Sequence, residues 1–191
     1  MDSGGANLAS LQYALERAGA RSHLSCDPQA IASASHIVLP GVGAAADAMQ
    51  RLRSSGLAVA LTTLTQPVLG ICLGMQLLYR DSEEGPTQCL GVLPDSVSRI
   101  HSAPGRPVPH MGWNQVTVKR DDPLMEGLGP EPYAYFVHSY AAPVSPLTLA
   151  HTEYGKPICA VVRRENFCGT QFHPERSGQA GARLLANFLR L

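Results

Sequence analysis

The apolar residues in the first half of the chain fall into short blocks that alternate between helical and strand periodicity. Leu8, Leu11 and Leu15 repeat at helical spacing as far as Gly19, whereas 36–39 is a short continuous apolar run, as in strands buried on both faces. The predicted strands are 21–25, 36–39 and 68–71, and the predicted helices are 8–19, a short one after Asp27-Pro28, 44–55 and 57–65. This alternation implies an α/β fold with parallel strands, crossover helices and a site at the carboxyl ends of the strands.

The second half of the chain has a different pattern, in which short β-branched and aromatic runs predict antiparallel strands. The runs are 116–118, 133–137, 147–150, 158–163 and 167–171, after a loop and edge segment at 81–109 with one strand near 97–100. Residues 164–166 are predicted to form the hairpin connection between the last two strands. A closing helix is predicted from Gly178, with a buried stripe of Ala182, Leu185, Phe188 and Leu189.

The stretch 67–79 is predicted to be a buried strand that breaks sharply into a helix at Cys72. Gly70 and Gly74 stand two residues before and two residues after this cysteine. That is the spacing of a nucleophile elbow, in which glycines allow close backbone approach around a strained turn. At the start of a helix, the positive end of the dipole favours a thiolate, and free backbone N–H groups can hold an oxyanion. The alternative is a buried structural cysteine, because free cysteine is among the most buried residue types.

Length, charge and cysteine content narrow the class of protein. The 191 residues suit a single domain spanning 1–191. Fifteen Lys and Arg residues balance fifteen Asp and Glu residues, so no basic footprint for nucleic acid or an anionic membrane is present. The five cysteines are dispersed, without CxxC spacing or a signal peptide, which indicates a reduced, cytoplasmic protein. The longest apolar run is interrupted by Gln76 and is too short to span a bilayer.

A nucleophilic cysteine requires a base, and His173 is the best placed of the seven histidines. Pro174 favours extended backbone at His173, so residues 173 and 175 can project to the same side. Glu175 can then hold one ring nitrogen while the other faces Cys72, the general arrangement of nucleophile, base and orienting carboxylate. The alternative is a surface turn that only precedes the last helix.

The remaining histidines offer weaker alternatives. His110 and His138 are competing bases, but neither has a carboxylate two residues away. A metal site would have to draw on histidines without ligand spacing such as HxxxH or HExxH, namely His36, His101, His110, His138 and His151. We therefore expect no metal and no cofactor.

Together these stretches resemble the class I, or triad, glutamine amidotransferases, and within them the family of glutaminase subunits of imidazole glycerol phosphate synthase. The resemblance covers nearly the whole chain, and its strongest pieces are 39–43 (LPGVG), 70–78 (GICLGMQLL), 82–85 (SEEG), 109–114 (PHMGWN), 135–140 (YFVHSY) and 171–175 (QFHPE). It implies an α/β fold of the class I glutamine amidotransferase type, with a mixed, mostly parallel central sheet flanked by helices and with additional antiparallel strands.

The resemblance also implies a role for individual residues. Cys72 would attack the side-chain carboxamide of glutamine to form a thioester, His173 would relay the proton to the departing ammonia, and Glu175 would orient His173. The implied oxyanion hole comprises Gly41, Val42, Gly43 and Leu73. The implied glutamine-binding residues are Gln76, Glu84, Ser139 and Tyr140.

A partner is implied as well, because ammonia released into neutral water becomes ammonium and is no longer a nucleophile. The family's partner is a cyclase subunit with a (β/α)8 barrel, which uses the ammonia to make imidazole glycerol phosphate and an aminoimidazole carboxamide ribotide in histidine biosynthesis. The resemblance implies a heterodimer with Asn7, Trp113 and Arg176 near its interface. The family often has Lys at the position of Arg176.

One departure from the family concerns the start of the sequence. Family members begin with a strand of about six apolar residues before the glycine-rich turn, and here Met1 stands where that strand would end. The fold is therefore expected to lack a central strand, which would leave ladder groups unpaired. An added apolar hexapeptide ahead of residue 1 is expected to raise the melting temperature.

Three other readings of the sequence are open. The glutaminase subunit of vitamin B6 synthase has a similar triad, but 109–114 and 135–140 disfavour it. A cysteine peptidase or chaperone of the elbow type would carry a different surrounding for its nucleophile. A catalytically silent binding subunit would follow if the absent strand distorted the site.

Overall fold

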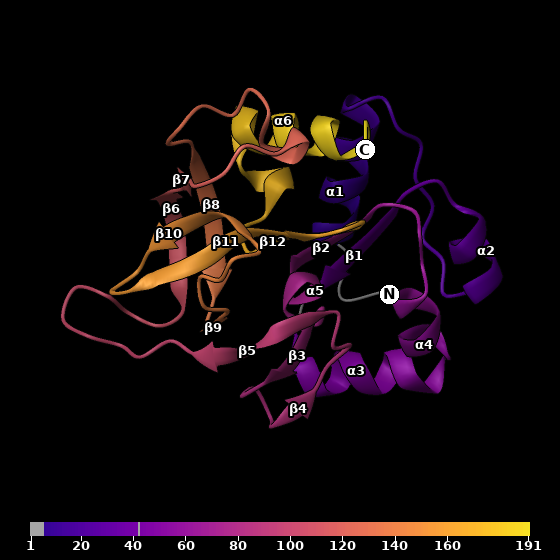
Figure 1. Ribbon diagram of the computed structural model, residues 1–191, viewed down its shortest axis with the longest axis horizontal. Coiled ribbons are helices and arrows are strands. Elements are labelled where there is room, and N and C mark those ends of the chain that lie inside the picture. The colour runs from indigo at the N-terminus through magenta and orange to yellow at the C-terminus, as the bar shows by residue number, and fades with distance from the viewer. Residues whose placement is uncertain (1–5, 42) are drawn as a thin grey trace.

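The computed structural model describes residues 6–41 and 43–191, with side chains from residue 8 onward, and is organised around a six-stranded sheet (Figure 1). The strand order in this sheet is β1-β2-β12-β11-β10-β7. Its strands are β1 (Ile37–Gly41), β2 (Val68–Cys72), β12 (Phe167–Thr170), β11 (Pro157–Arg164), β10 (Thr148–Glu153) and β7 (Thr117–Val118). Strands β2 and β12, which are neighbours in space, are far apart in the sequence.

The sheet is mixed, as expected for the predicted fold class. β1, β2 and β12 run parallel, whereas the pairs β12–β11, β11–β10 and β10–β7 are antiparallel. β10 consequently runs in the same direction as β1, β2 and β12, so four of the six strands share one direction. The parallel part lies in the first half of the chain plus β12, and the antiparallel part lies in the second half.

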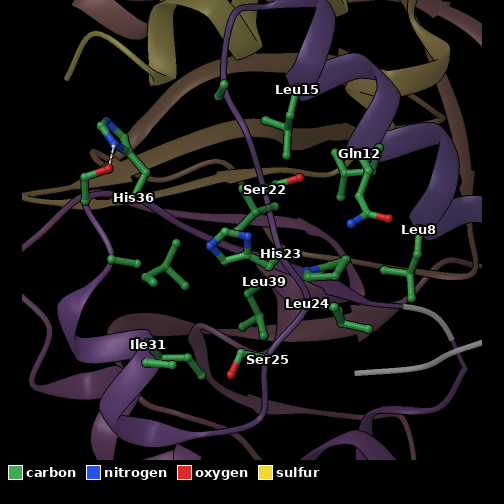
Figure 2. Close-up of a pocket in the computed structure, with 18 of the residues that line it drawn as sticks. Leu8, Gln12, Leu15, Ser22, His23, Leu24, Ser25, Ile31, His36 and Leu39 are labelled. Carbon is green, nitrogen blue, oxygen red and sulfur yellow. Dashed lines mark hydrogen bonds between the residues drawn. The ribbon is translucent and has the colours of Figure 1, made fainter.

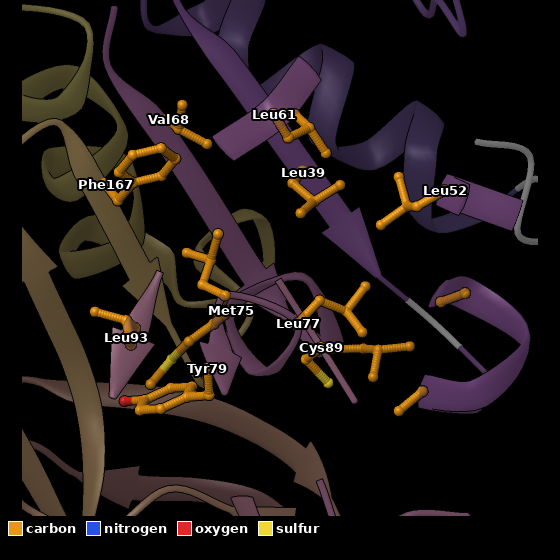
Figure 3. Packing of buried hydrophobic residues seen from close by; sticks show 14 of the residues in the cluster. Leu39, Leu52, Leu61, Val68, Met75, Leu77, Tyr79, Cys89, Leu93 and Phe167 are labelled. Carbon is orange, nitrogen blue, oxygen red and sulfur yellow. The ribbon is translucent and has the colours of Figure 1, made fainter. Parts of the chain in front are cut away.

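Helices cover both faces of the sheet (Figure 1). On one face, α1 (Ala6–Arg17) and α6 (Gly178–Phe188) pack on a cluster that includes Leu69 and Ile71 of β2. On the other face, α3 (Ala45–Ser54), α4 (Leu57–Thr62) and α5 (Leu73–Gln76) pack with Val68 and Phe167 (Figure 3). Successive strand residues point to opposite faces, so the continuous apolar run of β2 feeds both cores and fixes its carboxyl end.

Two smaller sheets extend from this core. One has the order β4-β3-β5-β9, and the other pairs β6 with β8. Their strands are β3 (Tyr79–Ser82), β4 (Thr87–Gln88), β5 (Leu93–Arg99), β9 (Tyr140–Ala141), β6 (His110–Gln115) and β8 (Tyr133–His138). The remaining elements are α2 (Pro28–Ser33) and the 3-10 turns η1 (Pro123–Met125) and η2 (Pro174–Arg176). None of the described helices is long and apolar enough to cross a membrane.

Most predicted elements are confirmed, and several details are wrong. Residues 21–25 form no strand, and α5 ends at Gln76 because Tyr79 begins β3. The short strands β3, β4, β6 and β9 were not predicted. In α6, Ala182 is exposed, and Gly181 and Leu184 lie on the buried stripe instead. The hairpin at 164–166 is confirmed, with Glu165 in the left-handed region at φ 55°.

The outer edge of β1 borders a cavity of about 380 Å³ (Figure 2). Among the described strands, β1 is at the end of the sheet order and pairs only with β2. The cavity lies between β1 and the extended stretch 21–25, and Leu8, Leu15 and Ile31 reach its wall from α1 and α2. The expected absence of a first strand concerns a position outside the described residues, but the cavity forms a groove along the open edge of β1.

Candidate active site

Cys72 is held at a strained turn between two rigid elements. It is the last residue of β2, whose five residues are all buried, and α5 begins at the next residue. Its backbone has φ 54° and ψ −112°, a combination that costs a non-glycine residue on the order of 1–3 kcal/mol and persists only where the surroundings impose it. The strain places the sulfur at the carboxyl edge of the parallel strands, where an α/β sheet is expected to carry its site.

The two glycines of the elbow are required by close backbone approach. A Cβ on Gly70 would lie 2.6 Å from the backbone nitrogen of Met75, and a Cβ on Gly74 would overlap the carbonyl oxygen of Leu39. Only glycine allows α5 to sit this close to β1 and β2. The spacing of Gly70, Cys72 and Gly74 therefore reflects the packing of three elements.

His173 lies on the turn that follows β12, the parallel neighbour of the strand that ends at Cys72. Its backbone is extended, with φ −93° and ψ 100°, as expected for a residue before proline. The Nδ1 atom of His173 lies 2.9 Å from Oε1 of Glu175, and both side chains are almost fully buried. Ser177 holds the turn in place, because its hydroxyl donates to the carbonyl of His173 at 2.7 Å and accepts from the N–H of Tyr135 at 2.9 Å.

The protonation of His173 is set by opposing effects. Burial, the largest, lowers its pKa, but hydrogen bonds to Cys72 and Glu175 and the charges of those two groups raise the pKa to about 10. Glu175 thus holds one ring nitrogen of His173, with 2.9 Å between Nδ1 and Oε1. A charged imidazole is therefore favoured at neutral pH, and this is the form that can give a proton to a leaving group.

Two further groups touch the Cys72 sulfur. The thiol donates to the carbonyl of Val137 at 3.7 Å, and the side-chain amide of Gln171 donates to the sulfur at 3.9 Å. Gln171 is wholly buried and its Oε1 accepts from Nε2 of Gln76 at 3.0 Å. The site therefore gathers a cysteine, a histidine, a carboxylate and an amide donor at one sheet edge.

The chain matches a protein-family model over its whole length. The model of the family described as glutamine amidotransferase class-I matches residues 1–191. The chain belongs to the class-I glutamine amidotransferase family. The elbow, the buried histidine and its carboxylate thus occur in a protein of the family that the sequence motifs resemble.

Individual relatives of this amidotransferase are similar over its full length. It is 51% identical over 191 residues to "Imidazole glycerol phosphate synthase subunit HisH" of Xanthomonas axonopodis pv. citri (strain 306), and 52% identical to the protein of that name from Xanthomonas campestris pv. campestris (strain 8004). Each alignment covers 100% of this chain and 96% of the relative. Among solved structures, a putative GMP synthase protein from Thermoplasma acidophilum is 20% identical, with a TM-score of 0.76, covering 100% of this chain and 90% of that one, which shows a shared fold.

Two of the predicted oxyanion residues of the amidotransferase, Gly41 and Leu73, border Cys72. Gly41, the last residue of β1, is paired in register with Cys72. Leu73 is the first residue of α5, a position whose N–H has no partner within the helix. Gly43 has φ 87°, and Val42 lies outside the described residues.

The predicted glutamine-binding residues come from three segments around the elbow. Gln76 is buried and both amide hydrogens are used, one on the carbonyl of Tyr140 at 2.8 Å and one on Gln171. Glu84 is half-buried and accepts from the N–H of Ala45 at 2.8 Å, at the amino end of α3. The carbonyl of Ser139 accepts from the N–H of Ile100. A contact of Gln76 with a substrate is therefore limited to its Oε1.

Two of the three predicted interface residues lie together. The guanidinium of Arg176 stacks over the ring of Tyr135 at 5.1 Å, and the ring of Trp113 meets this tyrosine edge-on at 6.1 Å. Trp113 is 56% exposed. The side chain of Asn7 lies outside the described part of the chain, although its backbone belongs to α1.

The competing histidines are paired with each other instead of with Cys72. Nδ1 of His110 lies 3.0 Å from Nε2 of His138, and both rings are buried. In the part of the chain that the structure describes, no three His, Cys, Asp or Glu side chains gather as a metal site would require. The cavity beside β1 is separate from the elbow, since none of its lining residues is Cys72, His173 or Glu175.

Sequence reasoning missed three residues that contact the site: Gln171, Val137 and Ser177. Gln171 belongs to the motif QFHPE, where its place two residues before His173 on a buried segment was the available signal. Val137 acts through its carbonyl, which no side-chain pattern reveals. Ser177 was visible only as a small polar residue before α6.

Proposed function

We propose that the chain hydrolyses glutamine to glutamate and ammonia through Cys72, His173 and Glu175, and that the ammonia passes to the cyclase subunit of imidazole glycerol phosphate synthase in histidine biosynthesis. The observation that carries the proposal is the placement of a strained elbow cysteine and a buried His–Glu pair after the neighbouring parallel strands β2 and β12 of a class-I glutamine amidotransferase. Full-length identity of about half to relatives with the synthase subunit name supports the choice of pathway.

The contacts of Cys72 set the order of the chemical steps. In its thiol form the sulfur is bonded to the Val137 carbonyl, and transfer of the proton to His173 exchanges that bond for the ion pair. The thiolate attacks the side-chain carbonyl carbon of glutamine, and His173 gives the proton to the leaving nitrogen as the C–N bond breaks. Water then attacks the thioester, His173 takes its proton, and glutamate and the thiol are released.

The charge that develops on the carbonyl oxygen needs donors that are already in place. The N–H of Leu73 and one from the 41–43 turn are assigned this role, since Gly41 and Cys72 are neighbours in the sheet. Loss of one such donor costs ~3–4 kcal/mol in comparable sites. Oε1 of Gln76, the carboxylate of Glu84 and the backbone at Ser139 and Tyr140 are assigned to the amino-acid part of glutamine.

The outer face of the β6–β8 sheet is the proposed docking surface for the cyclase. Met111, Trp113 and Tyr133 are 63%, 56% and 58% exposed, and exposed aromatic and methionine side chains are enriched where proteins dock. Strand β8 of this sheet also contacts the site, because its carbonyls accept from the His173 N–H and from the Cys72 thiol. A partner on this face would lie one strand away from the released ammonia.

Glutamate release tests both parts of the proposal. We expect release by the wild-type chain to increase when the cyclase subunit is added together with its ligand, and Cys72→Ala to abolish it. Trp113→Ala is expected to weaken stimulation by the cyclase while leaving the chain folded, and Tyr13→Ala, an exposed aromatic on α1, is the matched control. Casein cleavage without glutamine turnover would overturn the proposal.

A further inference from the structure

A hydrogen-bond network runs from Asn114 on β6 through His110 and His138 to the carbonyl of Tyr140. Nδ2 of Asn114 lies 3.2 Å from Nε2 of His110, Nδ1 of His110 lies 3.0 Å from Nε2 of His138, and Nδ1 of His138 lies 2.8 Å from the Tyr140 oxygen. Neither histidine touches Cys72 through any of these bonds. The proposed chemistry gives them no proton to carry.

The Tyr140 carbonyl fixes which atom is the donor in every bond of this network. A carbonyl only accepts, so Nδ1 of His138 carries the proton, and its Nε2 in the neutral ring is an acceptor. The bond from His110 must therefore come from a proton on its own Nδ1, which leaves its Nε2 to accept from the Asn114 amide. The second hydrogen of that amide goes to the carbonyl of Glu153 at 3.0 Å, and its oxygen accepts from the N–H of Gln115.

The surroundings keep both rings neutral and fixed. Burial lowers the pKa of His110 to about 4. Burial is also the main cause that lowers the pKa of His138 to about 3. His110 is stacked between the rings of Phe136 and Tyr154, at 4.8 and 4.0 Å between centroids. Rings held in this way keep one tautomer, because the other would set two donors or two acceptors against each other.

The Tyr140 carbonyl connects this hydrogen-bond network to the Cys72 sulfur. It also accepts from Nε2 of Gln76, whose other amide hydrogen is bonded to Gln171, and Gln171 donates to Cys72. Movement of this carbonyl would therefore release both Gln76 and the amide that faces the sulfur. The backbone at 139–140 is also the segment assigned to glutamine under the proposed function.

We propose that His110 and His138 are positioning residues for the glutamine site. They fix the Tyr140 carbonyl through a hydrogen-bond network that begins at Asn114 and in which each side chain donates to the next group. This inference rests on the proposed function for its substrate. The two neutral, aligned rings then serve to hold the Tyr140 carbonyl. Strand β6, which carries the exposed Trp113, is thereby connected to the binding of glutamine.

The tautomers are tested first, on the complete wild-type chain. Nitrogen-15 correlation spectra of the imidazole rings at neutral pH are expected to show His110 and His138 neutral, each with its proton on Nδ1. A proton on Nε2 of either ring, or a charged ring, would contradict the assigned direction of these hydrogen bonds. This measurement needs neither substrate nor variant.

Kinetics of glutamate release, with saturating cyclase subunit, test the positioning role. His138→Phe keeps a ring but loses the donor to Tyr140, and we expect KM for glutamine to rise about tenfold or more while kcat changes less than about threefold. His138→Asn keeps an N–H donor near the Nδ1 position, and its KM is expected within about threefold of wild type. His101→Phe, at an exposed position, controls for the substitution itself.

The outcomes separate this inference from the proposed function. An unchanged KM in His138→Phe, or an equal loss in His138→Asn, would overturn the positioning role while an active wild type keeps the glutaminase. Absence of glutamate release from the wild type would instead reject the proposed function. Thermal unfolding of each variant identifies one that fails to fold, in which case the spectra of the wild type decide.

Discussion

The sulfur of Cys72 lies 3.7 Å from the main-chain carbonyl oxygen of Val137 on β8. Two residues earlier on that strand, the carbonyl of Tyr135 accepts from the N–H of His173 at 3.0 Å. One strand edge thus holds both the Cys72 sulfur and the backbone of His173. The outer side chains of the same strand pair are exposed, so a protein bound there would act on the site through a single strand.

Replacing Cys72 by Ala and by Gly separates its chemical from its conformational role. Both variants are expected to lose glutamate release by at least about a thousandfold. Because Cys72 has φ 54°, Cys72→Gly is expected to be more stable to urea than Cys72→Ala by about 1 kcal/mol.

Cys168 in the middle of β12 is the matched control for this pair. It lies in an extended strand, where glycine costs roughly 0.5–1 kcal/mol relative to alanine, so the order of stability is expected to reverse. An Ala variant at position 72 that equals or exceeds the Gly variant would contradict a strained elbow.

Removing the charge of Glu175 tests the orientation of the base. Glu175→Gln keeps the size of the side chain but no longer favours a charged His173, so kcat is expected to fall at least about a hundredfold. The control is Glu165→Gln in the exposed hairpin turn. Steady-state rates within about twofold of wild type for Glu175→Gln would show that the carboxylate has no part in the reaction.

The raised pKa of His173 predicts a change in stability with alkaline pH. The folded-state pKa of His173, about 10, lies above the ordinary value of 6.5. The stability that the protonated imidazole contributes to the fold is therefore fully present below about pH 6.5 and is lost as pH rises through about 10. The stability advantage of wild type over His173→Gln is expected to shrink by about 1 kcal/mol or more between about pH 6 and about pH 9.5. Urea titrations at both pH values measure it, and an advantage that grows with pH would reverse the assigned sign.

Local sequence was sufficient for the elements that local packing fixes. The spacing of Gly70, Cys72 and Gly74 predicted the elbow because backbone approach allows nothing larger there. Pro174 similarly predicted the extended His173. Asp27 was predicted to begin α2, and its side chain accepts from the N–H of Gln29.

Features that depend on distant pairing could not be predicted in the same way. α5 is short because Tyr79 pairs with Leu93 of β5, and β6 is a strand because β8, more than twenty residues later, pairs with it. Gln171 reaches the site across 99 residues of sequence. Residues 21–25 form no strand because the cavity separates them from β1.

The groove beside β1 gives a test by addition. Fusing six apolar, β-branched residues ahead of residue 1 is expected to raise the melting temperature by about 5 °C or more, because such a segment can pair with the open edge of β1 and fill the cavity of about 380 Å³. A Gly/Ser hexapeptide of equal length is the control. Equal melting temperatures for the two extensions would mean that the groove does not accept a strand.

The central claim is that glutamine is cleaved through a thioester on Cys72. Mass spectrometry of the chain, quenched in acid during turnover of glutamine with the cyclase subunit present, tests it most directly. We predict one γ-glutamyl group on the peptide that contains Cys72, lost on treatment with hydroxylamine and absent from Cys72→Ala. A γ-glutamyl group on another residue, or undiminished glutamate release by Cys72→Ala, would contradict the account.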